Sequence, residues 1–334
     1  MSSLGVVVGP AGRAEVLDRY VEFVAARCRP NTVIATVSDL RVFFAVIDKE
    51  PAAVTPADVF EFIAAQRRGE GDGRVVRLAD GEAGLAARTI RRRLAVMSGL
   101  FNWLVLCGDM AANPVPRGMA TRRTGAGGRP TGSPLIRTPR TLPKVLDPAD
   151  VIGLLGAVRR WRDRAMLEAM VLGGLRCCEV IGLRLEDLQP TQRRVFIVDG
   201  KGGHQRLIPM SAQFFASVSN YLSLERPAGS ASDALFVVLK SSRRGSALSI
   251  NGLEQIVASA KTRAGLERAT CHQLRHTCLT RLREAGMALE AIQAQAGHRS
   301  IESTRVYLHL ADDWLAGEYQ RASDLIDASV GILK

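Results

Sequence analysis

Long uncharged runs are missing from this sequence of 334 residues. The uncharged run 94–108 has fifteen residues and ends at Asp109, whereas a membrane-spanning helix needs about 20 apolar residues. It is better interpreted as a buried helix. Residues 1–10 lack the basic and apolar regions of a secretory signal peptide. We therefore expect a cytoplasmic protein without a membrane partner.

Cysteines are few and follow no ligand pattern. The six stand at positions 28, 107, 177, 178, 271 and 278, and none of their spacings is typical of a metal site. Without a secretion signal, disulfides are disfavoured as well. The sequence therefore predicts reduced core thiols, with no metal and no cofactor.

Acidic residues are also in short supply. Lys and Arg total 45 against 33 Asp and Glu, which gives a net charge of +12. Such a balance favours a polyanionic partner, with nucleic acid as the first candidate and an anionic membrane as the second. The length and the 47% hydrophobic content predict a real core and two domains.

The first domain, residues 1–116, is predicted to be all-helical. Helices are expected at 13–28, after a break at Pro30-Asn31, from Thr55 to about Gln66, and at 86–107, with a Gly-rich polar loop at 69–84. Thr55 is the expected N-cap of the third helix with Asp58 at N3, and the fourth helix carries Ile90, Leu94 and Met97 on one apolar face. The second helix has a predicted buried face formed by Ile34, Val37, Leu40, Phe44 and Ile47.

Four arginines crowd the start of the fourth helix, where positive charge opposes the helix dipole. They are Arg88, Arg91, Arg92 and Arg93. A solvated helix face and a DNA phosphate contact explain them about equally well, since a bound phosphate would relieve both the mutual repulsion and the dipole mismatch.

Residues 117–146 are predicted to form a basic interdomain linker. They contain seven Lys or Arg, no acidic residue, five Gly and four Pro, a composition that cannot form a core of its own. The segment is either a passive tether or a stretch that follows the DNA backbone.

The second domain, residues 147–334, is predicted to be mixed. Asp147 and Asn251 are expected to cap helices that begin near 148 and 250, with further helices at 161–172 and 211–225. Residues 194–198 and 205–209 form a predicted β-hairpin, and 235–239 a strand or extended segment. The fold class is therefore mainly α with a small sheet.

Residues suited to phosphate chemistry are spread along this domain. Arg176 follows two glycines and has Glu179 one turn later; Lys201 occupies the hairpin tip. Taken alone, these are a structural salt bridge and a soluble turn residue. Farther along stand two histidines, an arginine and a tyrosine, which can supply cationic donors and a nucleophile, in the order His272, Arg275, His298 and Tyr307.

The order of these motifs resembles the tyrosine recombinases, the phage integrase family. The resemblance rests on Gly-Leu-Arg176-x-x-Glu179, Lys201 in a Gly-rich hairpin, His272-x-x-Arg275-His-Thr, Gly-His298 and Tyr307-x-His309. It covers about residues 147–310; over 13–113 it is architectural only. It implies a helical, SAM-like core-binding domain followed by an integrase-type catalytic domain. Cys177-Cys178 and Ala296 depart from the usual pattern.

The resemblance also implies a reaction, the site-specific cutting and rejoining of DNA by an integrase or recombinase of a mobile element. Tyr307 would attack a phosphodiester and form a 3′-phosphotyrosyl link without metal or ATP. Arg176, Arg275 and His298 would stabilise the charge, His272 would act as general base and Lys201 as general acid. Glu179 would position Arg176; His204 and His276 are treated as structural, and His309 receives no step.

The expected partner is double-stranded DNA carrying an inverted-repeat recombination site, bound by a homotetramer. The segment 312–333 has helical spacing, and it either closes its own domain or docks on a neighbouring subunit. Two alternatives remain open: a DNA-binding accessory protein, indicated by a helix-turn-helix-like run at 273–295, and a type IB-like topoisomerase or resolvase.

Overall fold

The computed structural model describes residues 11–68, 84–116, 118, 135–136, 145–198 and 205–297. The chain divides into two compact units, Met1–Arg140 and Thr141–Lys334. The division falls within the predicted linker 117–146, most of which lies outside the described residues. Among the described helices, none is long and apolar enough to cross a membrane.

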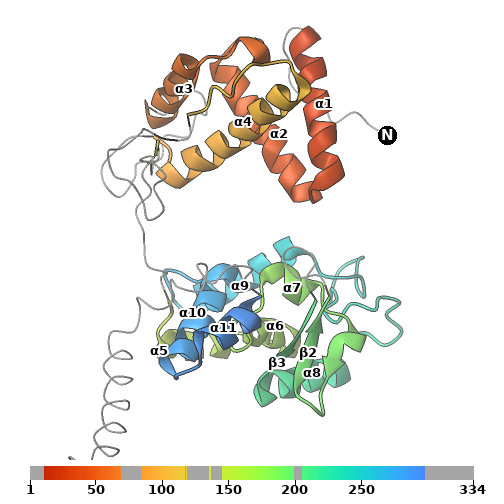
Figure 1. Ribbon diagram of the computed structural model, residues 1–334. Coiled ribbons are helices and arrows are strands. Elements are labelled where there is room, and N and C mark those ends of the chain that lie inside the picture. The colour runs from red at the N-terminus through yellow and green to blue at the C-terminus, as the bar shows by residue number, and fades with distance from the viewer. Residues whose placement is uncertain are drawn as a thin grey trace, which may run out of the picture. The chain divides into compact units, whose positions relative to one another are not determined.

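Helices make up the described part of the first unit (Figure 1). They are α1 (Ala11–Arg27), α2 (Pro30–Val46), the short 3₁₀ helix η1 (Pro51–Ala53), α3 (Pro56–Arg68) and α4 (Ala87–Cys107). The start of α3 is capped as predicted, because the Thr55 backbone N–H and hydroxyl each donate to Asp58 Oδ2 at 2.8 Å.

The core of this unit is aromatic. The rings of Phe62 and Phe101 lie 4.9 and 6.2 Å from that of Phe43. The predicted face of α2 was wrong at one position, since Ile34 is 60% exposed and Val33 is buried in its place. The face is therefore turned by one residue at its beginning.

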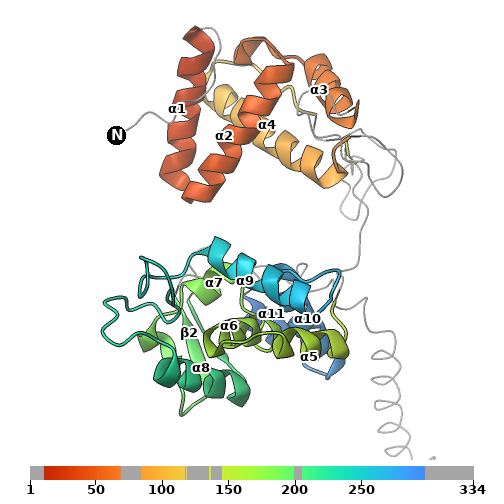
Figure 2. The ribbon, with the colours of Figure 1, turned by 180° about the vertical axis from the view of Figure 1, so that it is seen from behind.

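The second unit packs its helices around one buried helix, with a small sheet at one side (Figures 1 and 2). Its helices are α5 (Pro148–Gly156), α6 (Trp161–Val171), α7 (Cys177–Ile181), η2 (Leu185–Asp187), α8 (Ala212–Leu224), α9 (Ile250–Arg263), α10 (Cys271–Glu284) and α11 (Leu289–Ala296). Helix α6 is buried over most of its length, which explains why its sequence shows little amphipathic contrast.

The hairpin is present, and it belongs to a three-stranded antiparallel sheet. Strands β1 (Leu188–Gln189), β2 (Arg194–Ile197) and β3 (Arg206–Pro209) lie in that order. Val195 pairs with Ile208, and both are buried. The hairpin tip, residues 199–204, lies outside the described residues. The fold is therefore mainly α with a small sheet, as predicted.

One predicted helix cap is wrong, and another is correct in position but makes no side-chain capping bond. Ser249 caps α9 in place of Asn251, because its side chain accepts from the Gly252 N–H. Asp147 does occupy the N-cap position of α5, but its side chain makes no capping hydrogen bond. Residues 235–239 do not form a strand; Val237 makes an isolated bridge to Ala247.

Candidate active site

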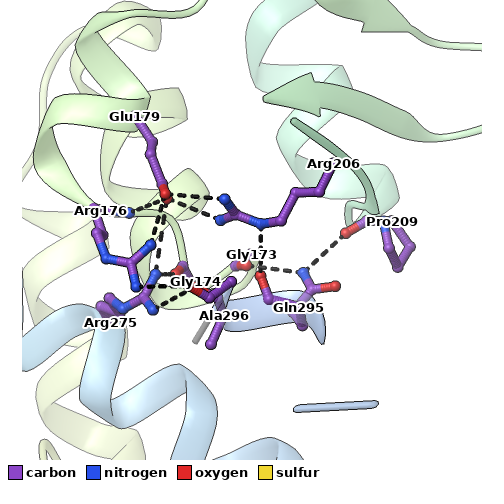
Figure 3. A network of polar contacts seen from close by, with 10 residues as sticks. Gly173, Gly174, Arg176, Glu179, Arg206, Pro209, Arg275, Gln295 and Ala296 are labelled. Atoms are coloured by element: carbon purple, nitrogen blue, oxygen red, sulfur yellow. Dashed lines mark hydrogen bonds and ion pairs between the residues drawn. The ribbon is translucent and has the colours of Figure 1, made fainter. Parts of the chain in front are cut away.

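One buried carboxylate organises the polar network of the second unit. Glu179 is fully buried in α7, and it faces three guanidinium groups (Figure 3). Arg176 donates to it from its backbone N–H at 2.9 Å and from Nη1 at 2.7 Å. Arg206 donates from both terminal nitrogens at 3.0 Å, and Arg275 Nη1 lies 3.8 Å away.

The protonation of Glu179 follows from these contacts. Burial opposes ionisation, but the hydrogen bonds from Arg206 and Arg176 outweigh it and hold the pKa of Glu179 below its usual value. The carboxylate is therefore charged at neutral pH, and it can fix all three guanidinium groups at once.

The same three arginines bind the end of α11. The carbonyl oxygens of three successive residues accept from them, Gln295 from Arg206 Nε at 3.3 Å, Ala296 from Arg275 Nη2 at 2.7 Å, and Gly297 from Arg176 Nη2 at 3.2 Å. Carbonyls at a helix C-terminus lack partners within the helix and carry partial negative charge. Cationic donors therefore satisfy them well.

Two glycines before Arg176 complete the network. The Gly174 carbonyl accepts from Arg275 Nη1, and the Gly173 carbonyl accepts from Gln295 Nε2 at 2.9 Å. Gly174 has φ +70, and a Cβ on Gly173 would lie 2.4 Å from Met210 Sδ. Larger residues at these two positions would therefore disturb this turn.

His272 lies one turn before Arg275 on α10 and forms a pair with His276. Their Nε2 atoms are 2.8 Å apart, and the rings meet edge to face. Burial, His272 and Arg275 together lower the pKa of His276 to about 4. His276 is therefore neutral at pH 7 and can hold the His272 ring in one orientation, which deepens its predicted structural role.

A pocket of about 670 Å³ brings predicted site residues together. Its lining includes Arg176 from the start of α7 and both His272 and Arg275 from α10. Lys201, His298 and Tyr307 lie outside the described residues, as do His204, His309 and the segment 312–333. Three of the six predicted catalytic residues are therefore seen around one space.

Sequence reasoning missed Arg206 and Gln295. Arg206 shares a face of β3 with the buried Ile208, while Leu207 between them is 41% exposed. An arginine on the inward face of a strand needs a buried counter-charge. The alternation of inward and outward residues along β3 was therefore the sequence signal that could have identified Arg206. Nothing in the sequence singled out Gln295.

The four arginines of α4 differ in burial. Arg88 and Arg91 are exposed. Arg92 Nη2 donates to the buried Asp39 at 2.7 Å, and Arg93 is 7% exposed with its Nη1 bonded to Gln66. Asp39 thus relieves part of the charge crowding, and the predicted phosphate contact of Arg93 does not fit its burial.

Cysteine burial also departs from the prediction of core thiols. All six are free, but Cys278 alone is buried; Cys28, Cys107 and Cys178 are exposed. Within the described ranges, no three His, Cys, Asp or Glu side chains form a group that could hold a metal ion.

Comparison with known proteins decides the family. The phage integrase family matches residues 144–313. Tyrosine recombinase XerC of Escherichia coli O157:H7 is 32% identical over 247 residues, which cover 72% of this chain and 75% of that protein. The chain belongs to the phage integrase family of tyrosine recombinases. It is accordingly a site-specific recombinase that acts on DNA.

Solved structures of this family share the fold. The integrase of transposon Tn1549, in complex with a circular intermediate DNA, aligns with a TM-score of 0.67 at 17% identity over 92% of this chain and 99% of that one. A lambda integrase dimer bound to a COC′ core site has a TM-score of 0.61 at 17% identity and covers 86% and 95%. The tyrosine recombinase therefore has the integrase fold at low sequence identity.

Proposed function

We propose that this tyrosine recombinase cuts and rejoins double-stranded DNA at inverted-repeat sites through a transient 3′-phosphotyrosyl link. The observation that carries the proposal is the placement of Arg176 and Arg275 on one buried carboxylate, with His272 lining the same pocket. In-line phosphoryl transfer places negative charge on the nonbridging oxygens, and fixed guanidinium donors stabilise it.

The residue roles follow the chemistry of each group. Tyr307 is the nucleophile, and because a phenol has a pKa of about 10 it needs a base, which we assign to His272. Lys201 protonates the leaving 5′-oxygen, and His298 joins the two arginines as a third donor. The 5′-hydroxyl of a partner strand then attacks the phosphotyrosyl link, which conserves bond energy without hydrolysis.

The assembly we propose is a homotetramer that joins two DNA sites in the cytoplasm. A lambda integrase tetramer bound to a Holliday junction has a TM-score of 0.61 against this chain at 16% identity, covering 86% of this chain and 77% of that one. The net charge of +12 supports binding to the DNA backbone.

The test is covalent trapping on a nicked suicide substrate. Tyr307→Phe should abolish the protein–DNA adduct while DNA binding is kept, and the matched variant Tyr319→Phe should still form it. An adduct of normal yield in Tyr307→Phe would place the nucleophile elsewhere. No adduct in the natural protein would favour an accessory DNA-binding role, and relaxation of supercoils without strand exchange would favour a topoisomerase.

A further inference from the structure

Two half-buried thiols stand beside the predicted catalytic groups. Cys177 is the first residue of α7 and directly follows Arg176; Cys271 is the first residue of α10 and directly precedes His272. Both cysteines line the same pocket as Arg176, His272 and Arg275. Segments far apart in the sequence thus bring two thiols to one wall of the site.

The two side chains lie close enough to each other to share a hydrogen bond. The bond with Cys271, together with burial, raises the pKa of Cys177; accepting the bond lowers the pKa of Cys271. Cys271 also lies at the N-terminus of a fourteen-residue helix, where backbone N–H groups stabilise a thiolate. The N-terminus of this long helix favours the thiolate on Cys271, which makes Cys271 the nucleophilic member of the pair.

Neighbouring thiols are less suited to react. Burial raises the pKa of Cys278 to about 12, so it remains a protonated core thiol. Cys178 adjoins Cys177 in sequence but is exposed. Metal binding is a weaker explanation of the pair, because the described residues offer no third ligand grouped with it.

We propose that Cys177 and Cys271 are a peroxide-sensitive pair that closes into a disulfide and thereby stops DNA cleavage. The effect on cleavage rests on the proposed function, whereas the bond itself does not. Within a reducing compartment, such disulfides are typically transient and regulatory.

The chemistry balances with peroxide as the oxidant. The Cys271 thiolate attacks one peroxide oxygen, an S–O bond forms, the O–O bond breaks, and the leaving hydroxide is protonated to water. The sulfur of Cys177 then attacks the Cys271 sulfur, the S–S bond forms, the S–O bond breaks, and a second water leaves with the Cys177 proton. Two thiols and one hydrogen peroxide give one disulfide and two waters.

The bond would change the site through its neighbours. A disulfide joins sulfurs at about 2.05 Å, closer than a hydrogen-bonded thiol pair, so its formation pulls the first residues of α7 and α10 toward each other unless the two side chains rotate instead. Arg176 and His272 are the adjacent residues, and under the proposal they shift with the two cysteines. A displacement of about 1 Å can lower the rate of a positioned reaction about 100-fold.

The experiment treats the full chain with stoichiometric hydrogen peroxide and reads two signals. Peptide mapping without reductant should find a Cys177–Cys271 disulfide, and adduct yield on the suicide substrate should fall at least about tenfold, then recover with dithiothreitol. Cys271→Ser and Cys177→Ser should keep their adduct yield after peroxide. Cys178→Ser is the matched control and should remain as sensitive as the natural protein.

Three results would overturn the proposal: a map without the Cys177–Cys271 bond, a vicinal Cys177–Cys178 bond in its place, or a formed bond with undiminished adduct. Mapping uses the natural protein, so it decides the bond even if a serine variant folds badly. An absence of adduct in the reduced protein would instead count against the proposed function.

Discussion

Glu179→Gln should separate the anchoring of the arginines from the folding of the unit. The amide keeps the size of the carboxylate, but it removes the only negative side chain among the contacts drawn from Arg176, Arg206 and Arg275. It also turns an N–H₂ donor toward groups that can only donate.

The magnitude follows from burial. Glu179 is fully buried, and its partners Arg176, Arg206 and Arg275 are 19%, 13% and 5% exposed. Removing one member of a buried ionic group costs about 3–5 kcal/mol, a large share of the ~5–15 kcal/mol that holds a domain folded. We expect that loss in urea unfolding, and a fall in single-turnover adduct formation of about 100-fold because the guanidinium groups lose their positions.

Glu168→Gln is the matched control. The Glu168 side chain is equally buried, but it pairs with Arg164 on the same helix at 2.9 Å, and none of the side-chain hydrogen bonds or ion pairs described for the Glu179 network involves it. It should lower stability by about 1–3 kcal/mol and leave the adduct rate of the folded protein unchanged. Glu179→Gln with a loss under about 1 kcal/mol and a normal rate would refute the reasoning, as would an equal rate loss in both variants.

The other predictions concern Arg206 and His276 in the second unit and the arginines of α4 in the first. Arg206→Lys should retain charge but lose the paired hydrogen bonds, so adduct formation should fall about 10–100-fold while DNA affinity measured by gel shift is kept; an unchanged rate would contradict this. The pKa of His276 is lowered to about 4 in the folded chain, so between about pH 6.5 and 4 the unfolded chain binds one more proton at this residue than the folded chain does. The free energy of unfolding should therefore fall as the pH drops through that interval. After allowance for partial exposure, the free energy of unfolding of His276→Asn, measured in urea, should fall by about 1–2 kcal/mol less over that interval than that of the natural protein. Identical pH dependence in the two proteins would rule this out. Arg88→Ala and Arg91→Ala should each reduce the salt dependence of DNA binding by about one phosphate contact, whereas Arg93→Gln should chiefly destabilise its unit; the reverse pattern would reject the assignment by burial.

Local signals predicted the elements well. Thr55 and Asp58 set the start of α3, and the spacing of Ile90, Leu94 and Met97 predicted the buried face of α4. Such features depend on residues within one or two turns, so the sequence alone suffices. The prediction that Ile34 is buried was wrong because its neighbour Val33 fits the same helical periodicity. Which of the two is buried depends on the elements that pack against α2.

Long-range pairing was beyond local reading. The sequence linked Glu179 to Arg176, three positions away, but the contacts of Glu179 with Arg206 and Arg275 depend on how strands and helices meet. Asp39 in α2 likewise pairs with Arg92 in α4. Motif order indicated which residues belong to the site, and only the fold could indicate which of them bind one another.

The carbonyl oxygens of Gln295, Ala296 and Gly297 give the site a property beyond geometry. Three guanidinium groups surround the single carboxylate of Glu179, and they also donate to the uncharged carbonyls of Gly174, Gln295, Ala296 and Gly297, so this network of described residues carries a net positive charge before any phosphate binds. Each guanidinium group is already held by at least two hydrogen bonds, so less side-chain ordering is needed when a phosphodiester binds. Under the proposed mechanism, the arginines that bind the phosphate are therefore in place before the DNA binds. The time of each strand cut then depends on when the nucleophile reaches the phosphate.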